Sequence, residues 1–166
     1  MKFFRSIVLI LLLSGLFITS CSSNKSDDDI PVDKEVSIYL VTKYDPSTTG
    51  EEIVCGDALI EIKEEITADR SVLEATIRKL LEIKSENDTR NYVKGPALLL
   101  YQVTIANKVA DIYLKGDFDI KELCDIARIE AQLKETAKQF DDINQANFYI
   151  NNETLEHYLS VQRRSF

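Results

Sequence analysis

The chain has 166 residues, enough for one domain of ordinary size with its own hydrophobic core. Its 28 acidic residues outnumber 20 basic ones, and the formal net charge of −8 argues against nucleic-acid binding, which needs clustered positive charge. One His and three Cys leave few side chains for a metal centre or a catalytic triad. We therefore expect no metal, no cofactor and no nucleic-acid partner.

Residues 1–20 have the composition of a secretory signal peptide. Lys2 and Arg5 form a basic start, an apolar run follows over 7–18, and small residues precede Cys21. The run is shorter than the about 20 residues that a membrane-spanning helix needs. Ile-Thr-Ser-Cys at 18–21 resembles the bacterial lipobox, which implies cleavage before Cys21 and lipidation of that residue. An uncleaved anchor, or a plain signal peptide beside an unmodified Cys, is the alternative.

Residues 21–34 are mostly small, polar and acidic, so they cannot bury enough apolar surface to fold and are predicted to form a flexible tether. Ser22 stands where lipoproteins of the inner membrane typically have Asp, and this resemblance favours the outer membrane. The Asp27-Asp28-Asp29 run resembles an acidic tract that directs some lipoproteins to the cell surface, and a solvated spacer is the alternative. The expected location is the cell envelope, with the chain lipid-anchored on the periplasmic or surface side.

The first half of the expected domain, which spans 35–159, reads as strands followed by a helix. Alternating apolar residues predict a strand over 35–41, and 53–66 is predicted to be one broken strand or two short ones. Ser71 followed by Glu74 is a capping box that opens a helix, which an apolar stripe continues to about residue 85.

The second half begins with a predicted hairpin, in which strands over 99–105 and 109–114 flank Asn107-Lys108. Asp119 is predicted to cap a second helix whose apolar stripe runs to Phe140. Residues 146–150 form the last predicted strand. A short closing element is expected over 153–159, and 160–166 is expected to be a frayed tail.

This order of elements predicts an α+β fold. Two amphipathic helices need a sheet to cover, so we expect a two-layer domain with a mixed or antiparallel sheet of about four to five strands covered by two helices.

Four stretches of this pattern resemble one known family. They are a strand at 36–40, a helix at 73–81, a turn and strand at 107–114, and a helix and strand at 129–140 and 148–152. Together they are similar to the GerMN domain, the sporulation and spore germination domain of bacterial envelope lipoproteins. The family's turns often read Asp-Gly, where this chain has Asn107-Lys108 and Asn151-Asn152. Membership would imply a non-catalytic binding or assembly module, with no catalytic residues to carry over.

Cys55 and Cys124 are the two thiols that remain once Cys21 is lipidated. In an exported protein an even pair of Cys predicts a disulfide, and two buried apolar thiols are the alternative. The rival function is an exported enzyme, a thiol- or carboxylate-based hydrolase, that uses either a site in the 86–95 region or a Cys55–His157 pair. No nucleophile motif accompanies these residues, so we expect no enzyme.

Exposed Tyr side chains favour protein interfaces, and the candidate interface residues are Tyr44, Tyr92, Tyr101 and Tyr113. Packing on a half-buried sheet is the alternative for each of them. The expected function is a membrane-anchored binding or scaffold module that recognises an envelope protein or a cell-wall polymer. A third hypothesis is a self-assembling structural module, a homo-oligomer that pairs through an exposed sheet edge.

Overall fold

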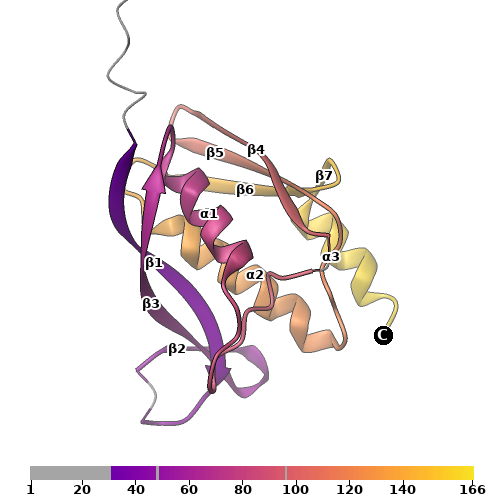
Figure 1. The fold of residues 1–166 in the computed structure, drawn as a ribbon. Coiled ribbons are helices and arrows are strands. Elements are labelled where there is room, and N and C mark those ends of the chain that lie inside the picture. Colours follow the sequence, from indigo (N-terminus) through magenta and orange to yellow (C-terminus); the bar gives the residue numbers. More distant parts are fainter. Residues whose placement is uncertain (1–30, 48, 96) are drawn as a thin grey trace, which may run out of the picture.

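A computed structural model describes residues 31–47, 49–95 and 97–166 (Figure 1). The signal peptide, Cys21 and tether residues 22–30 lie outside the described residues. The structure confirms the α+β class, with three α-helices and two sheets of three and four strands among the described residues. None of the described helices is both long and apolar enough to span a bilayer.

The three-stranded sheet is built on one long antiparallel pair. β1 (Val32–Lys43) and β3 (Asp57–Ala68) stay in register over their whole length. β2 (Glu51–Ile53) pairs with the other side of β3, and a 3-10 turn, η2 (Val54–Gly56), connects them. The segment expected to be one broken strand or two short ones is therefore two strands separated by a turn.

The four-stranded sheet is mixed, as expected. Its order is β4 (Leu99–Ala106), β5 (Val109–Lys115), β6 (Gln145–Ile150) and β7 (Glu153–Thr154), and only β5 and β6 run parallel. The hairpin between β4 and β5 is confirmed, and its turn residues Asn107 and Lys108 have φ of 52° and 63°. A type I′ hairpin turn requires positive φ at both of its central residues, so Asn107-Lys108 takes the place of the Asp-Gly that is common in such turns.

The first helix, α1 (Val72–Glu82), begins where its sequence signal places it. The Ser71 Oγ accepts a hydrogen bond from the Glu74 amide at 3.2 Å, as the capping box predicts. Its apolar stripe places Leu73, Ile77 and Leu80 in the core.

The second helix, α2 (Leu123–Lys138), begins later than predicted, because Glu122 rather than Asp119 is its N-cap. The Asp125 carboxylate accepts the Glu122 amide at 3.2 Å, which completes the cap. Phe118 is buried, and its ring meets that of Tyr158 edge-on at 5.9 Å. This contact holds Phe118 in the core, and residues 119–121, which follow it, stay outside the helix. The closing element is a third helix, α3 (Leu155–Arg163), which extends past the expected residue 159.

Both sheets and all three helices contribute to one hydrophobic core. Ile38 of β1, Ile77 of α1, Ile112 of β5, Ile129 of α2 and Ile150 of β6 are all fully buried. Each such side chain contributes about 1.5–3 kcal/mol by leaving water. In Figure 1 the helices lie on one side of the β4–β7 sheet, which leaves its other side open.

Side chains of α2 and of its C-cap residue, Gln139, cover the outer edge of β1. The Gln139 side chain accepts the Ser37 amide at 2.8 Å and donates to the Ser37 carbonyl at 2.7 Å. Two residues further along the strand, the Tyr39 amide donates to the Thr136 Oγ1 at 3.3 Å, and Gln132 donates to the Tyr39 carbonyl at 2.9 Å. Backbone groups that would otherwise need a neighbouring strand are thereby satisfied by a helix.

The same closure continues into the segment after α1. Val41 and Arg90 exchange two backbone hydrogen bonds at 2.9 and 2.7 Å. The side-chain Oε1 of Gln132 also accepts a hydrogen bond from the Tyr92 backbone amide at 2.7 Å. The buried side chain of Gln132 therefore joins β1, α2 and this segment.

We expect Gln132→Leu to lower the free energy of unfolding by about 2–4 kcal/mol, because it leaves the Tyr39 carbonyl and the Tyr92 amide buried without their partner. Urea denaturation measures the loss, and hydrogen exchange should become faster at the Tyr92 amide. The control is Gln145→Leu, at an exposed position, which should change stability by less than about 0.5 kcal/mol. Equal effects of the two variants would contradict the structural role of Gln132.

Candidate functional site

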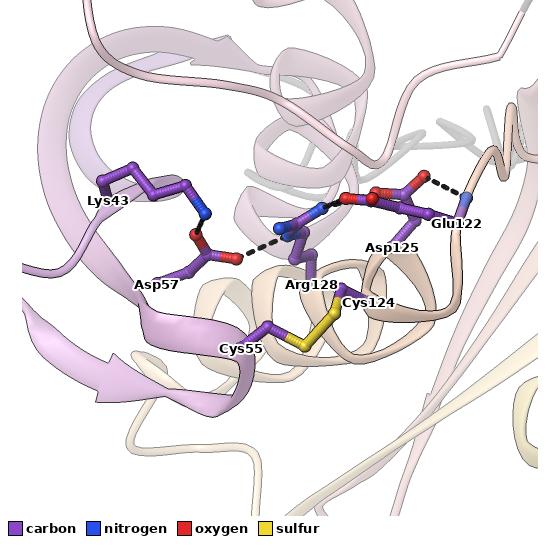
Figure 2. The surroundings of a disulfide bond; sticks show 7 residues. All are labelled: Lys43, Cys55, Asp57, Glu122, Cys124, Asp125 and Arg128. Carbon is purple, nitrogen blue, oxygen red and sulfur yellow. Dashed lines mark hydrogen bonds and ion pairs between the residues drawn. A yellow bond between two sulfur atoms is a disulfide. The ribbon is translucent and has the colours of Figure 1, made fainter.

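A disulfide joins η2 to the start of α2 (Figure 2). Cys55 and Cys124 are 69 positions apart, and their Cα atoms lie 6.2 Å apart. The predicted disulfide is thus confirmed, and the alternative of two buried thiols is wrong. Cys55 is also exposed and has a φ of 69°, a left-handed conformation that a non-glycine residue adopts only where its surroundings hold it.

Beside the disulfide, Arg128 of α2 is the centre of a buried ion-pair network (Figure 2). Its side chain is 6% exposed, and its Nε donates to the Asp57 carboxylate at 2.6 Å. Its Nη1 donates to Asp125 at 2.8 Å and also to Glu122. The ring of Tyr92 covers the guanidinium at 4.8 Å.

The network favours the charged forms of Asp57 and Arg128. Burial opposes the charge on Asp57, but hydrogen bonds from Lys43, at 2.7 Å, and from Arg128 outweigh it and hold the pKa of this carboxyl below its ordinary value. Burial likewise opposes the charge on Arg128, and the three carboxylates raise its pKa above the ordinary value. Removing one member of a buried ion pair is costly, because its partner is left charged and unpaired, and groups held in this way are poorly suited to exchange protons with a substrate.

Two cavities flank this network, with volumes of ≈ 630 and ≈ 510 Å³. Arg90, Tyr92 and Glu122 line both of them. The carboxylates of Asp57, Glu122 and Asp125 are all paired with Arg128, so none of these three is a free carboxylate of the kind a glycoside hydrolase uses. Among the described residues, no group of three His, Cys, Asp or Glu side chains could hold a metal ion.

The structure also removes the thiol alternative. Cys55 is bonded to Cys124 and therefore has no thiolate to act as a nucleophile. His157, on α3, is exposed, and its Nε2 lies 3.8 Å from the Glu153 carboxylate.

The uncovered side of the β4–β7 sheet presents the second candidate surface. We call it the open face and define it by its large side chains, Leu99, Tyr101, Tyr113, Lys115 and Tyr149. Leu99 is 66% and Tyr101 59% exposed, and the Lys115 ammonium lies 3.5 Å from the centre of the Tyr101 ring. The rings of Tyr113 and Tyr149 stack at 4.7 Å. Aromatic side chains held on neighbouring strands make a rigid surface whose ordering costs little entropy on binding.

A polar pair lies on the same side of this sheet. Asn147 donates to the Asp111 carboxylate at 2.8 Å, and this pair lies two positions from the Tyr113–Tyr149 pair in the β5–β6 register. Burial, the nearby Asp111 carboxylate and a hydrogen bond to that carboxylate raise the pKa of Tyr149, so the hydroxyl stays protonated and joins this polar pair.

The four tyrosines predicted as interface residues lie in three places. Tyr101 and Tyr113 belong to the open face, Tyr92 packs on Arg128, and Tyr44 follows β1, where its amide donates to the Gly56 carbonyl. Sequence reasoning left Tyr149 out of the predicted set. The signal for it was present, because Tyr149 alternates with Phe148 and Ile150, which face the core.

We expect Arg128→Met to lower the free energy of unfolding by about 3–5 kcal/mol, because it leaves buried carboxylates without their cation. Urea denaturation at neutral pH measures the loss. Arg78→Met is the control, since its ion pair with Glu74 is exposed and contributes no more than about 1 kcal/mol. Similar losses in both variants would mean that the network does not stabilise the fold.

Reduction of the disulfide should lower the free energy of unfolding by about 4 kcal/mol, because the loop it closes is long. Denaturation with and without dithiothreitol measures the difference. The double variant Cys55→Ala, Cys124→Ala should show the lower stability in both conditions. Thiol labelling of the denatured oxidised chain at positions 55 and 124 should find neither free, and labelling of both would contradict the disulfide.

Comparisons with known proteins place the fold. No family model matches the chain, and no curated protein sequence matches it. Among solved structures, the first GerMN domain of the sporulation protein GerM from Bacillus subtilis superimposes with a TM-score of 0.56 at 16% identity, over 74% of this chain and 86% of that one. A candidate lipoprotein from Clostridium perfringens gives a TM-score of 0.42 at 19% identity, over 73% and 76%. The resemblance inferred from the sequence is therefore confirmed for the fold: this chain has the fold of a GerMN domain.

Proposed function

We propose that this chain is a lipid-anchored, non-catalytic binding module of the bacterial cell envelope. It recognises an envelope protein or a cell-wall component through the open face. The observation that carries the proposal is that large apolar and aromatic side chains stand exposed on the uncovered side of a rigid sheet. Such a surface is typical of binding sites in proteins.

The sequence before the domain supports the envelope location. The lipobox-like residues 18–21 supply the anchor, and Ser22 after the Cys favours the outer membrane. The disulfide between Cys55 and Cys124 suits a domain that folds outside the cytoplasm, where thiols are oxidised. The GerMN fold is compatible with such a module, which the resemblance describes as non-catalytic.

The test is cross-linking in cells of the full-length chain, followed by mass spectrometry of what is captured. We expect the cross-linking to capture one recurrent envelope protein or, failing that, the purified chain to co-sediment with cell-wall polymer. The variant Cys21→Ala cannot be lipidated, and we expect it to lose the capture in cells. Tyr101→Ala should lower the capture at least fivefold, because it removes the most exposed ring of the open face.

The matched control is Tyr44→Ala, which removes a tyrosine that is 40% exposed and lies outside the open face. It should leave the capture unchanged. A capture that depends on Tyr44 and not on Tyr101 would move the binding surface to the disulfide end of the domain. If the experiments find no recurrent protein and no sedimentation with the polymer, the binding function itself is overturned.

A further inference from the structure

The two sheets have four outer edges, and three of them are covered, charged or short. Polar side chains of α2 and of its C-cap residue occupy the β1 edge at Ser37 and Tyr39. β2 has only three residues and begins with two glutamates, and β3 beyond it carries the charged residues Glu61, Lys63, Glu64 and Glu65. On the last side, β7 has two residues and leaves only four residues of β6 without a paired strand. Short length, charge and covering groups are the means by which proteins prevent edge-to-edge pairing.

The fourth edge, β4, lacks these protections over most of its length. Its eight residues (Leu-Leu-Tyr-Gln-Val-Thr-Ile-Ala) include no charged side chain and no Pro, and their one irregularity is a bulge at Tyr101. Within the described part of the chain, the backbone of β4 hydrogen-bonds only to β5. Leu99, Tyr101 and Ile105 are 66%, 59% and 46% exposed. A strand of this kind is a template for adding another strand.

We propose that β4 pairs with the β4 strand of a second copy of this chain, antiparallel and about a two-fold axis. Charge favours this occupant. The chain carries a net charge of −8, so two copies repel one another across most surfaces, whereas two β4 strands bring no like charges together. A two-fold contact is also self-complementary, because each copy supplies the same free edge.

The pairing joins two four-stranded sheets into one continuous sheet. In an antiparallel pair of this symmetry the two open faces lie on the same side, so the dimer presents the tyrosine-bearing surface twice. One short strand from each chain makes a small contact, in the class below about 1,200 Å² that gives weak association. We therefore expect the dimer to form where the chain is concentrated on a membrane rather than in dilute solution. The β4 pairing itself is independent of the proposed partner binding.

The test uses the full-length chain in its membrane with a single Cys introduced on β4, as Gln102→Cys or Thr104→Cys. The native Cys55 and Cys124 are bonded to each other, so the new thiol reports on its own surroundings. Under mild oxidation we expect a cross-linked species of twice the chain's mass. Its yield should be at least fivefold above that of Gln145→Cys, an exposed position on β6 away from the β4 edge.

Thr104→Lys, combined with Gln102→Cys, then tests the strand pairing. Thr104 is exposed and lies opposite Asp111 of β5, so a Lys there gains a carboxylate within its own chain while two Lys side chains approach each other across the axis. We expect the cross-linked yield to fall at least fivefold, while Thr104→Val, which keeps the branched shape without charge, retains it. Circular dichroism and membrane abundance check that each variant folds.

Three results would overturn the proposal. One is a cross-linked yield at Gln102 and Thr104 no higher than at Gln145. Another is a dimer that Thr104→Lys leaves intact. The third is a β4 cross-link to a protein of different mass, which would assign the edge to an extended segment of that protein instead. Capture of a partner through the open face is read separately, so it can succeed or fail whatever the dimer does.

Discussion

Three polar side chains, Gln132 and Thr136 of α2 and Gln139 at its C-cap, hydrogen-bond to the outer edge of β1. The rest of the structure depends on the position that these bonds give to the helix. With α2 held along β1, its first turns reach η2. There Cys124 bonds Cys55, and Arg128 of the second turn meets Asp57. Its buried apolar residues face the core shared with the second sheet. One helix thus closes an edge, bears the disulfide and joins both sheets.

The two ends of the domain consequently have different physical characters. Around Arg128, charged groups are buried and paired with one another next to the Cys55–Cys124 disulfide, so this end resists rearrangement. Across the second sheet, the open face shows apolar and aromatic groups whose strands are held by the core beneath them. Rigid support under an exposed surface is what pre-organised recognition requires, and this contrast favours binding over catalysis.

The predictions that succeeded rest on local signals. The Ser71 cap and the Asn107-Lys108 turn each involve neighbouring residues, and both were correct. Asp119 failed as a helix cap because burial of Phe118, a tertiary contact, decides where α2 begins. The alternation over 99–105 identified β4 as a strand. It did not show which residues are buried, because the bulge at Tyr101 shifts the parity: Leu100 and Val103 pack on the core, whereas Leu99 and Tyr101 are exposed.

Contacts between distant segments were harder to predict. The disulfide was inferred from the count of Cys in an exported chain rather than from geometry. The Arg128 network could not be inferred, since Asp57 and Arg128 are 71 positions apart and neither belongs to a motif. The closure of β1 was missed for the same reason: Gln132, Thr136 and Gln139 are ordinary helix residues until the helix is placed against a strand.

The closure of β1 also sets an order of events as the chain folds. The Ser37 backbone must wait for Gln139, which lies 102 residues later, and the Tyr39 carbonyl waits for Gln132, 93 residues later. A chain that folds as it is made, from its N-terminus, can pair β1 with β3 early, yet the other edge of β1 stays without hydrogen-bond partners until α2 is present. An unpaired strand edge of this kind is open to aggregation, and contacts between such distant residues form slowly. Protection by a chaperone would matter most in that interval, before the last third of the chain is available.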